Sequence, residues 1–249
     1  MRSTVIKLTG WLLGLWSITA VSAVLPLTEH TALYHVRFKG IGAGDFELRL
    51  SRSPGTDSYR YETIPHPSLL ARLIISADSR EVSEFEVTEH GVKPHSYHLN
   101  DGGSHKDDIQ LNYDWAQGRV SGHAASKPVN LGLLAGTQDV MSIRAAILYD
   151  LTAGKTTASY PMIDQDEQHT FIYRQIGHEV LATAQGSFDT QVWVSAAQGS
   201  NGHDKTWKYW YAPKLGYLPV RAEQLEDGHT RLSFELLKAT LINNDSSLR

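Results

Sequence analysis

Hydrophobic and polar residues alternate with a period of two along most of the chain. In residues 34–39, Tyr-His-Val-Arg-Phe-Lys, the apolar side chains fall on one face and the basic ones on the other, as in a half-buried strand. Residues 46–50 repeat the pattern. The same reasoning predicts strands at residues 59–63, 82–89, 96–100, 109–115, 120–123, 168–175, 179–184, 188–196, 205–211, 218–226 and 230–241.

Glycine-containing turns separate these segments. Between the first two strands, Gly40, Gly42 and Gly44 tolerate positive φ, which predicts a hairpin with a bulge or a tight bend. A phosphate-binding loop would need a helix after it, and here a strand follows. Gly177-His178 is interpreted as a turn between two strands.

One segment has helical spacing instead. From Thr137 to Thr152, the apolar residues Val140, Ile143, Ile147 and Leu151 recur every three to four positions. Thr137 is the predicted N-terminal cap. Asp139 places a carboxylate near the positive end of the helix dipole, and Gly154 can close the other end.

Roughly a dozen strands and one helix predict a mainly β protein. We expect a large curled antiparallel sheet, an open or half barrel, with one main α-helix packed on its concave face. There is no internal repeat, low-complexity linker or block of charge, so residues 24–249 are predicted to form a single domain.

The first 23 residues have the pattern of a secretory signal. Two basic residues precede a short apolar run, and Val21-Ser22-Ala23 supplies small residues at a cleavage site. The apolar run is shorter than the ~20 residues that a membrane-spanning helix needs. No cysteine follows to carry a lipid, so we expect a periplasmic protein that is soluble, and not membrane-spanning, after cleavage.

Composition narrows the possible partners. Without Arg2 and Lys7, 21 basic residues face 27 acidic ones, a net charge of −6, and the basic residues do not cluster. This argues against nucleic acid as a partner. The chain has no cysteine, which excludes disulfides, thiolate catalysis and cysteine metal sites.

The remaining chemistry is sparse. None of the twelve histidines is four positions from another, and His95 and His98 are predicted to point to opposite faces of a strand, so we expect no metal site and no cofactor. No G-x-S-x-G elbow is present. The acidic residues at 107–108 and 164–167 are interpreted as solvated turns, and the stretch 199–204 as a hairpin loop.

Aromatic residues concentrate between Trp207 and Arg221. Trp207, Tyr209 and Tyr211 would share one face of a strand as a core layer, followed by a corner at Ala212-Pro213 and a return strand. Trp210 faces the other way and must be covered by the helix, by a flap at residues 69–75, or by a ligand. Arg221 can pair with Glu223 or meet an anionic headgroup.

The segment that contains this flap, residues 68–75, is predicted to form a short helix, a buried strand or an exposed apolar segment. Periodicity does not separate these alternatives over eight residues. The candidate ligand-binding residues are Trp210, Arg221, Leu70 and Leu73.

Several short motifs, in order, resemble the bacterial exported family called domain of unknown function 3108. They are Tyr34-His35-Val36 before the glycine-rich turn, Gly91-Val92-Lys93-Pro94, Tyr113-Asp114-Trp115, Gln138-Asp139-Val140-Met141-Ser142, Gly186-Ser187-Phe188-Asp189-Thr190, and Trp210-Tyr211-Ala212-Pro213 with Leu218-Pro219-Val220-Arg221. The resemblance covers residues 32–241 and implies an envelope protein rich in β-structure, with no activity to carry over. The curled sheet is also similar to that of periplasmic lipoprotein carriers, which is an analogy of fold alone.

Three functions remain open from the sequence. The first is a non-catalytic carrier or binding module for an apolar or lipid-like ligand. The second is a hydrolase or lyase that acts on a cell-envelope polymer, with carboxylates and a histidine meeting in a cleft. The third is a structural or assembly partner of another envelope protein.

Overall fold

The computed structural model describes residues 26–73, 75–198 and 206–242, which contain fourteen strands and one α-helix. The predicted signal segment and the loop at 199–204 lie outside the described residues. The strands are β1 (Glu29–Phe38), β2 (Ile41–Arg52), β3 (Ser58–Pro67), β4 (Arg80–Thr88), β5 (Gly91–Asn100), β6 (Ile109–Asp114), β7 (Arg119–Ala124), β8 (Lys127–Gly132), β9 (Thr157–Asp164), β10 (Glu167–Thr183), β11 (Gly186–Ala197), β12 (Thr206–Ala212), β13 (Leu218–Glu226) and β14 (His229–Ile242).

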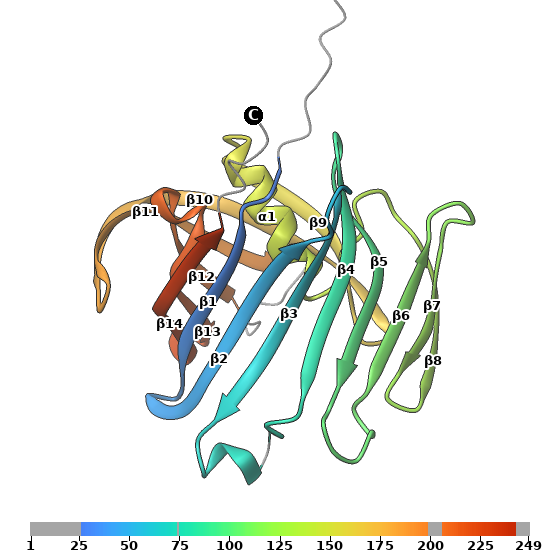
Figure 1. The fold of residues 1–249 in the computed structure, drawn as a ribbon, viewed down its shortest axis with the longest axis horizontal. Coiled ribbons are helices and arrows are strands. Elements are labelled where there is room, and N and C mark those ends of the chain that lie inside the picture. The colour runs from blue at the N-terminus through green and yellow to red at the C-terminus, as the bar shows by residue number, and fades with distance from the viewer. Residues whose placement is uncertain (1–25, 74, 199–205, 243–249) are drawn as a thin grey trace, which may run out of the picture.

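All fourteen strands belong to one antiparallel sheet, in the order β8-β7-β6-β5-β4-β3-β2-β1-β14-β13-β12-β11-β10-β9. The first and last strands pair at its centre, and each wing is a simple meander. The sheet curls around the helix, which lies on its concave face (Figure 1). Since β8 and β9 are its two edges, the sheet is not closed, and the predicted fold class is confirmed.

Irregular pairing helps the sheet to curl. Six of the thirteen strand pairs contain a register shift, and such bulges increase local twist. One of them lies in the β1–β2 hairpin, where Gly44 has a φ of +121°. A Cβ atom on Gly44 would lie 2.5 Å from the carbonyl oxygen of His66. The predicted glycine-rich hairpin with a bulge is therefore confirmed.

The helix α1 (Ser142–Thr152) begins five residues later than predicted. The backbone of Gln138 is extended instead: its N–H donates to the Pro161 carbonyl (2.8 Å), and its carbonyl accepts from the Ile163 N–H (2.9 Å). The prediction of Thr137 as the cap is wrong, because its hydroxyl bonds with the backbone of Leu134. Asp139 caps the helix, and its Oδ1 accepts the first free N–H groups.

The rest of the helix prediction is confirmed in part. Gly154 takes a φ of +76° and donates its N–H to the Leu151 carbonyl, which ends the helix as expected. Ile143, Ile147 and Leu151 of the predicted stripe are buried and Val140 is partly buried. Residues on the other sides of the helix, including Ala146 and Tyr149, are buried as well. Because α1 packs against β4, β5 and β9, it is enclosed rather than half exposed.

Two strands were not predicted, and both are edge strands. β8 contains Pro128 and β9 contains Pro161, and proline is tolerated at an edge because no neighbour needs its N–H. The predicted turn at Gly177-His178 is wrong. Gly177 lies at a register shift inside β10, a single strand of 17 residues that spans both predicted segments.

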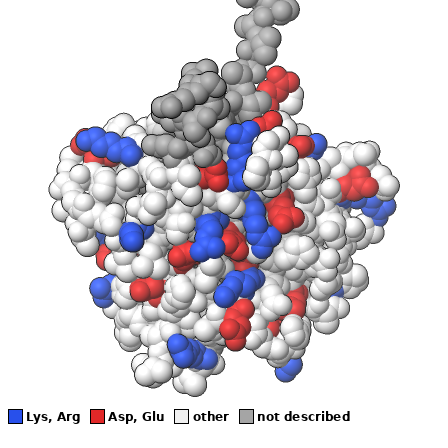
Figure 2. Space-filling model, viewed as in Figure 1, with Lys and Arg blue, Asp and Glu red and all other residues white. Residues whose placement is uncertain are grey.

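The outer face of the sheet carries interspersed charges of both signs (Figure 2). Arg60 Nη1 lies 2.8 Å from Glu84 Oε1, and Arg49 Nη1 lies 3.3 Å from Glu62 Oε1, each across neighbouring strands. Such exposed pairs contribute little to stability. They do mark this face as the solvated one, so the apolar residues of the same strands are directed to the concave side.

Candidate functional site

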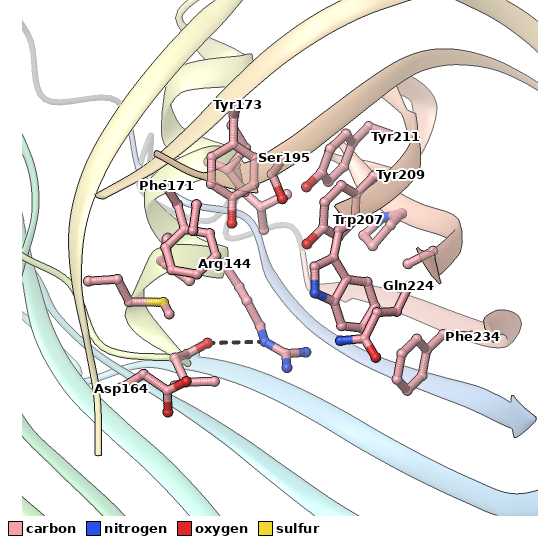
Figure 3. A pocket seen from close by; sticks show the side chains of 18 of the residues that line it. Arg144, Asp164, Phe171, Tyr173, Ser195, Trp207, Tyr209, Tyr211, Gln224 and Phe234 are labelled. Atoms are coloured by element: carbon pink, nitrogen blue, oxygen red, sulfur yellow. Dashed lines mark hydrogen bonds between the residues drawn. The ribbon is translucent and has the colours of Figure 1, made fainter. Parts of the chain in front are cut away.

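A cavity of about 740 Å³ lies between α1 and the concave face of the sheet. Residues of β1–β3 and β9–β14 line it together with the first turns of the helix (Figure 3). Its volume is within the range of roughly 300–1,000 Å³ that is typical of small-molecule sites. The candidate site is therefore this cavity, which the side chains between α1 and the sheet do not fill.

Aromatic rings in successive contact form one wall of the cavity, which we call the aromatic wall. Strand alternation places Trp207, Tyr209 and Tyr211 on the concave face of β12, as the sequence predicted. They line the cavity rather than a closed core layer. Ring centroids between 5.2 and 5.9 Å apart connect, in order, Tyr34, Phe46, Phe234, Trp207, Tyr209 and Tyr211.

Arg144 is the one basic side chain, apart from His169, among the described residues that line this cavity. It extends from the first turn of α1 into the cavity, and its Nε donates to the Val140 carbonyl at 3.3 Å (Figure 3). Burial lowers the pKa of Arg144. The Glu81 carboxylate and the neighbouring tyrosines more than offset that effect, so its pKa is raised and the guanidinium is charged.

The tyrosines around Arg144 are neutral. Burial raises the pKa of Tyr61 to about 12, although the charge of Arg144 lowers it. Burial likewise raises the pKa values of Tyr34, Tyr173, Tyr209 and Tyr211, and the charge of Arg144 opposes each increase. Their hydroxyls are therefore protonated at neutral pH and can donate hydrogen bonds.

The cavity opens toward one end of the sheet. Its exposed lining residues, Asp164, His169 and Gln198, lie at or near the β9–β10 and β11–β12 connections, and the partly exposed Glu226 ends β13. In an antiparallel meander these connections lie at the same end as the β1–β2 and β3–β4 connections. Tyr34 and Tyr211 of the sheet and Ile147 of α1, which also line the cavity, are buried. The cavity thus has a buried inner part and an open outer part.

Sequence reasoning did not identify Arg144 as a site residue, although the pattern contains a signal. Arg144 follows Val140 by four positions and precedes Ile147 by three, so it lies on the predicted apolar stripe. A charged residue on the buried stripe of a helix is rare unless it has a partner or a ligand. The spacing of apolar residues along the helix could not predict that a cavity lies between this face of the helix and the sheet.

The structure places two of the predicted ligand residues on the outer face of the sheet. The indole Nε1 of Trp210 donates to Glu179 Oε2 at 2.7 Å, and the ring lies under Lys208 Nζ (4.4 Å from its centroid) and Arg221 Cζ (5.3 Å). Arg221 pairs with Glu223, as one of the two predicted alternatives had it. Neither Trp210 nor Arg221 lines the cavity. The prediction that they bind a ligand therefore concerns the outer face of the sheet and stays a prediction.

The corner that follows is confirmed. β12 ends at Ala212, a short 3-10 helix, η2 (Pro213–Leu215), follows, and Gly216 takes a φ of +61° before β13 begins. The hydroxyl of Tyr34 donates to the Pro219 carbonyl at 3.0 Å, which ties the corner to the central strand β1.

Leu70 and Leu73 lie in the flap, whose described residues are 68–73 and 75 and include the 3-10 helix η1 (Ala71–Leu73). Leu69, Leu70 and Leu73 are 83%, 75% and 85% exposed. The Ser68 N–H donates to the Ala43 carbonyl, so the flap begins at the end of the sheet toward which the cavity opens. Of the three alternatives, the buried strand is wrong, because the described residues form an exposed apolar segment that contains one short 3-10 turn.

The described residues contain one group that has the spacing of a metal site: Asp101, His105 and Asp108 in the β5–β6 loop. Loop hydrogen bonds already occupy these groups: Asp101 accepts from the N–H groups of Gly103 and His105, and His105 Nδ1 lies 2.8 Å from Asp108 Oδ2.

His95 and His98 are both exposed, so the prediction of opposite faces is wrong. A register shift in the β4–β5 pairing at Glu84/Phe85 adds one residue to β5 and changes the alternation.

Chemically, the cavity is suited to binding. One lining hydroxyl, that of Tyr61, lies 3.1 Å from His30 Nε2. Because burial lowers the pKa of His30 to about 4 and raises that of Tyr61 to about 12, this pair does not resemble a nucleophile activated by its base. The buried carboxyl whose pKa burial raises to about 6, Asp139, caps α1 and does not line the cavity. No helix among the described residues has the length and apolar character to cross a membrane.

A family model described as "Protein of unknown function (DUF3108)" matches residues 33–235. A β-barrel-like protein of another domain of unknown function, DUF1849, from Brucella abortus has a similar fold, with a TM-score of 0.57, 10% identity and coverage of 88% of this chain and 100% of that chain. Comparison with curated proteins gives no match.

Two further structures match more weakly. The MucA/MucB complex of Pseudomonas aeruginosa has a TM-score of 0.39 at 10% identity, over 87% of this chain and 52% of that chain, so the match spans about half of its length. A Vibrio parahaemolyticus protein domain named for outer membrane lipoprotein sorting has a TM-score of 0.28 at 11% identity, over 89% of this chain and 87% of that chain.

Proposed function

The chain belongs to the DUF3108 family, and we propose that it is a non-catalytic binding protein whose cavity holds an apolar, lipid-like ligand. The observation that carries this proposal is the cavity beneath α1, with its aromatic wall and one open end. Aromatic rings offer a large apolar area to a ligand, and an unfilled apolar cavity leaves that area without packing partners. A ligand that fills the cavity buries this apolar area and supplies the missing packing contacts.

The exposed flap fits the same function. Leu70 and Leu73 are exposed and belong to the β3–β4 connection, which lies at the end of the sheet toward which the cavity opens. We propose that they contact the apolar part of the ligand as it enters. In addition, we propose that residues 1–23 direct export to the periplasm, where N-terminal sequencing of the mature protein should begin at Val24.

A cavity-filling substitution tests the binding function. Ala197 lines the cavity near its opening, whereas its neighbour Ala196 lies on the opposite face of β11. We expect Ala197→Trp to reduce binding of a fluorescent fatty acid at least tenfold, because the indole occupies the ligand's space. Ala196→Trp adds the same side chain outside the cavity and is the matched control.

Native mass spectrometry of the wild-type protein purified from the cell envelope provides a second test. We expect a co-purified lipid in wild type and in Ala196→Trp, and much less of it in Ala197→Trp. A wild-type protein that carries no lipid and binds no fatty acid would contradict the proposed function.

A further inference from the structure

Arg144 is a partly buried charge without a counter-ion among the described residues. Among the described residues, no carboxylate lies within 4.0 Å of its guanidinium, and the one hydrogen bond that its side chain makes is the 3.3 Å bond to the Val140 carbonyl. Placing a charge in an apolar site costs free energy unless a partner compensates it. The folded protein therefore keeps at Arg144 a positive charge that its own side chains leave unpaired.

The acidic residues around Arg144 do not provide it with a counter-ion. Glu81 acts on the guanidinium from a distance, and its carboxylate already accepts a 2.7 Å hydrogen bond from the Tyr97 hydroxyl. Asp164 and Glu226 line the open part of the cavity, but neither is within ion-pairing distance of Arg144. An acidic group inside the cavity must come from elsewhere.

Several hydrogen-bond donors line the cavity around Arg144. The hydroxyls of Tyr173 and Tyr209 are protonated and the charge of Arg144 acts on both, whereas the Tyr61 hydroxyl is already hydrogen-bonded to His30 Nε2 at 3.1 Å. The Trp207 indole and the Gln224 amide line the same cavity and have N–H groups to offer (Figure 3). A positive charge surrounded by donors matches an anion that has several acceptor oxygens.

We propose that Arg144 binds the acidic group, a carboxylate or a phosphate, of an amphiphilic ligand whose apolar body packs against the aromatic wall. This inference rests on the proposed function and specifies the class of ligand. The planar guanidinium can donate two parallel hydrogen bonds to either acid, an arrangement that a lysine ammonium does not reproduce. Neutral lipids would fill the cavity but leave the charge uncompensated.

Matched pairs of ligands test this specificity. A long-chain fatty acid is compared with the alcohol of the same chain length, and lysophosphatidic acid with the monoacylglycerol of the same acyl chain. A charged hydrogen-bonded pair contributes about 1.5–3 kcal/mol, so we expect wild type to prefer the acidic member of at least one pair by about 10- to 100-fold. The pair that shows the preference identifies the carboxylate or the phosphate.

Variants at position 144 separate recognition from folding. Arg144→Met keeps an apolar stem and removes the charge, so it should abolish the acid preference, and the acidic and neutral members of each pair should bind the variant with equal affinity. The unliganded variant should melt at the same temperature as wild type or higher, because a partly buried, unpaired charge is lost. Arg144→Lys should retain part of the preference, and Arg49→Met, on the outer face, should behave as wild type.

The outcomes are distinguishable. Equal affinity of wild type for all four ligands would overturn the role of Arg144 and leave the proposed function in place. An acid preference that persists in Arg144→Met would also overturn it, as would a variant that melts lower without ligand and binds as wild type does. If none of the four ligands binds, the proposed function fails and this inference with it.

Discussion

The hydroxyl of Ser83 donates a 2.8 Å hydrogen bond to Asp139 Oδ2, which joins β4 to the residue that caps α1. The other carboxylate oxygen accepts the N–H groups of Met141 (2.8 Å) and Ser142 (2.7 Å). Through these bonds the sheet fixes where the helix begins, and therefore where Arg144 enters the cavity. Burial nevertheless raises the pKa of Asp139 to about 6, although the hydrogen bonds oppose the increase.

Asp139 should make the protein less stable as the pH rises from about 4 to about 6. The unfolded chain loses the proton near pH 3.8 and the folded chain near pH 6, so the contribution to stability is greatest below pH 4 and is lost as the pH passes through 6. Asp139→Asn keeps a capping oxygen and cannot titrate. We expect its stability relative to wild type to increase by up to about 3 kcal/mol between pH 4 and pH 7, measured by urea unfolding. Parallel pH profiles would contradict this.

His30 should act in the opposite direction over an overlapping range. Burial lowers its pKa from 6.5 to about 4, while its bond to the Thr28 carbonyl raises it. The neutral ring contributes stability above pH 6.5 that is lost as the pH falls through 4. As the pH falls from 6.5 to 4, we expect the wild-type protein to lose up to about 3 kcal/mol more of its unfolding free energy than His30→Gln does. The measurement is the melting temperature as a function of pH, which should fall less steeply for the variant. His90→Gln, at a side chain that is 87% exposed, is the control and should follow wild type.

Gly44→Ala should destabilise the protein far more than Gly40→Ala. Both glycines have positive φ, which costs alanine about 1 kcal/mol, but only at Gly44 would the new Cβ meet backbone atoms, at 2.5 Å from His66 O and 2.6 Å from Ser68 N. We expect a loss of more than about 2 kcal/mol for Gly44→Ala and of about 1 kcal/mol for Gly40→Ala in chemical unfolding. Equal losses would show that β2 and β3 separate easily at this end.

The fold could be predicted from the sequence because alternation is strong in strands that have one wet and one buried face. The pattern was weakest at the edges, where Pro128 and Pro161 interrupt β8 and β9. It also failed where local signals compete with pairing: Gly177 has the character of a turn, but β11 pairs with β10 on both sides of it.

The site was harder to predict because it depends on what remains empty. The sequence placed Trp207, Tyr209 and Tyr211 on one face, but alternation does not tell whether a face is covered by side chains or by a cavity. It also directed attention to Trp210, whose indole is satisfied by Glu179, a residue 31 positions away. Only the curl of the sheet brings Arg144 from the helix to the aromatic wall.

Trp210 and Trp207 provide a matched pair that tests which face binds the ligand. Trp210→Phe loses the hydrogen bond to Glu179 and should cost about 1–2 kcal/mol of stability while leaving fatty-acid affinity unchanged. Trp207→Phe reduces the aromatic wall and should weaken binding. The measurements are chemical unfolding and titration with a fluorescent fatty acid. Loss of affinity in Trp210→Phe would instead support the ligand role that the sequence suggested.

Substitution of Leu70 and Leu73 should affect ligand entry without affecting the fold. Both side chains are mostly exposed, so the double variant Leu70→Ser, Leu73→Ser should change stability by no more than about 0.5 kcal/mol. If the proposed role of the flap in ligand entry is right, the variant should take up a fluorescent fatty acid from lipid vesicles several times more slowly at similar equilibrium affinity. Leu134→Ser, at a 55% exposed leucine in the connection between β8 and α1, is the control. Uptake by the double variant at the wild-type rate would show that the ligand enters without contacting the flap.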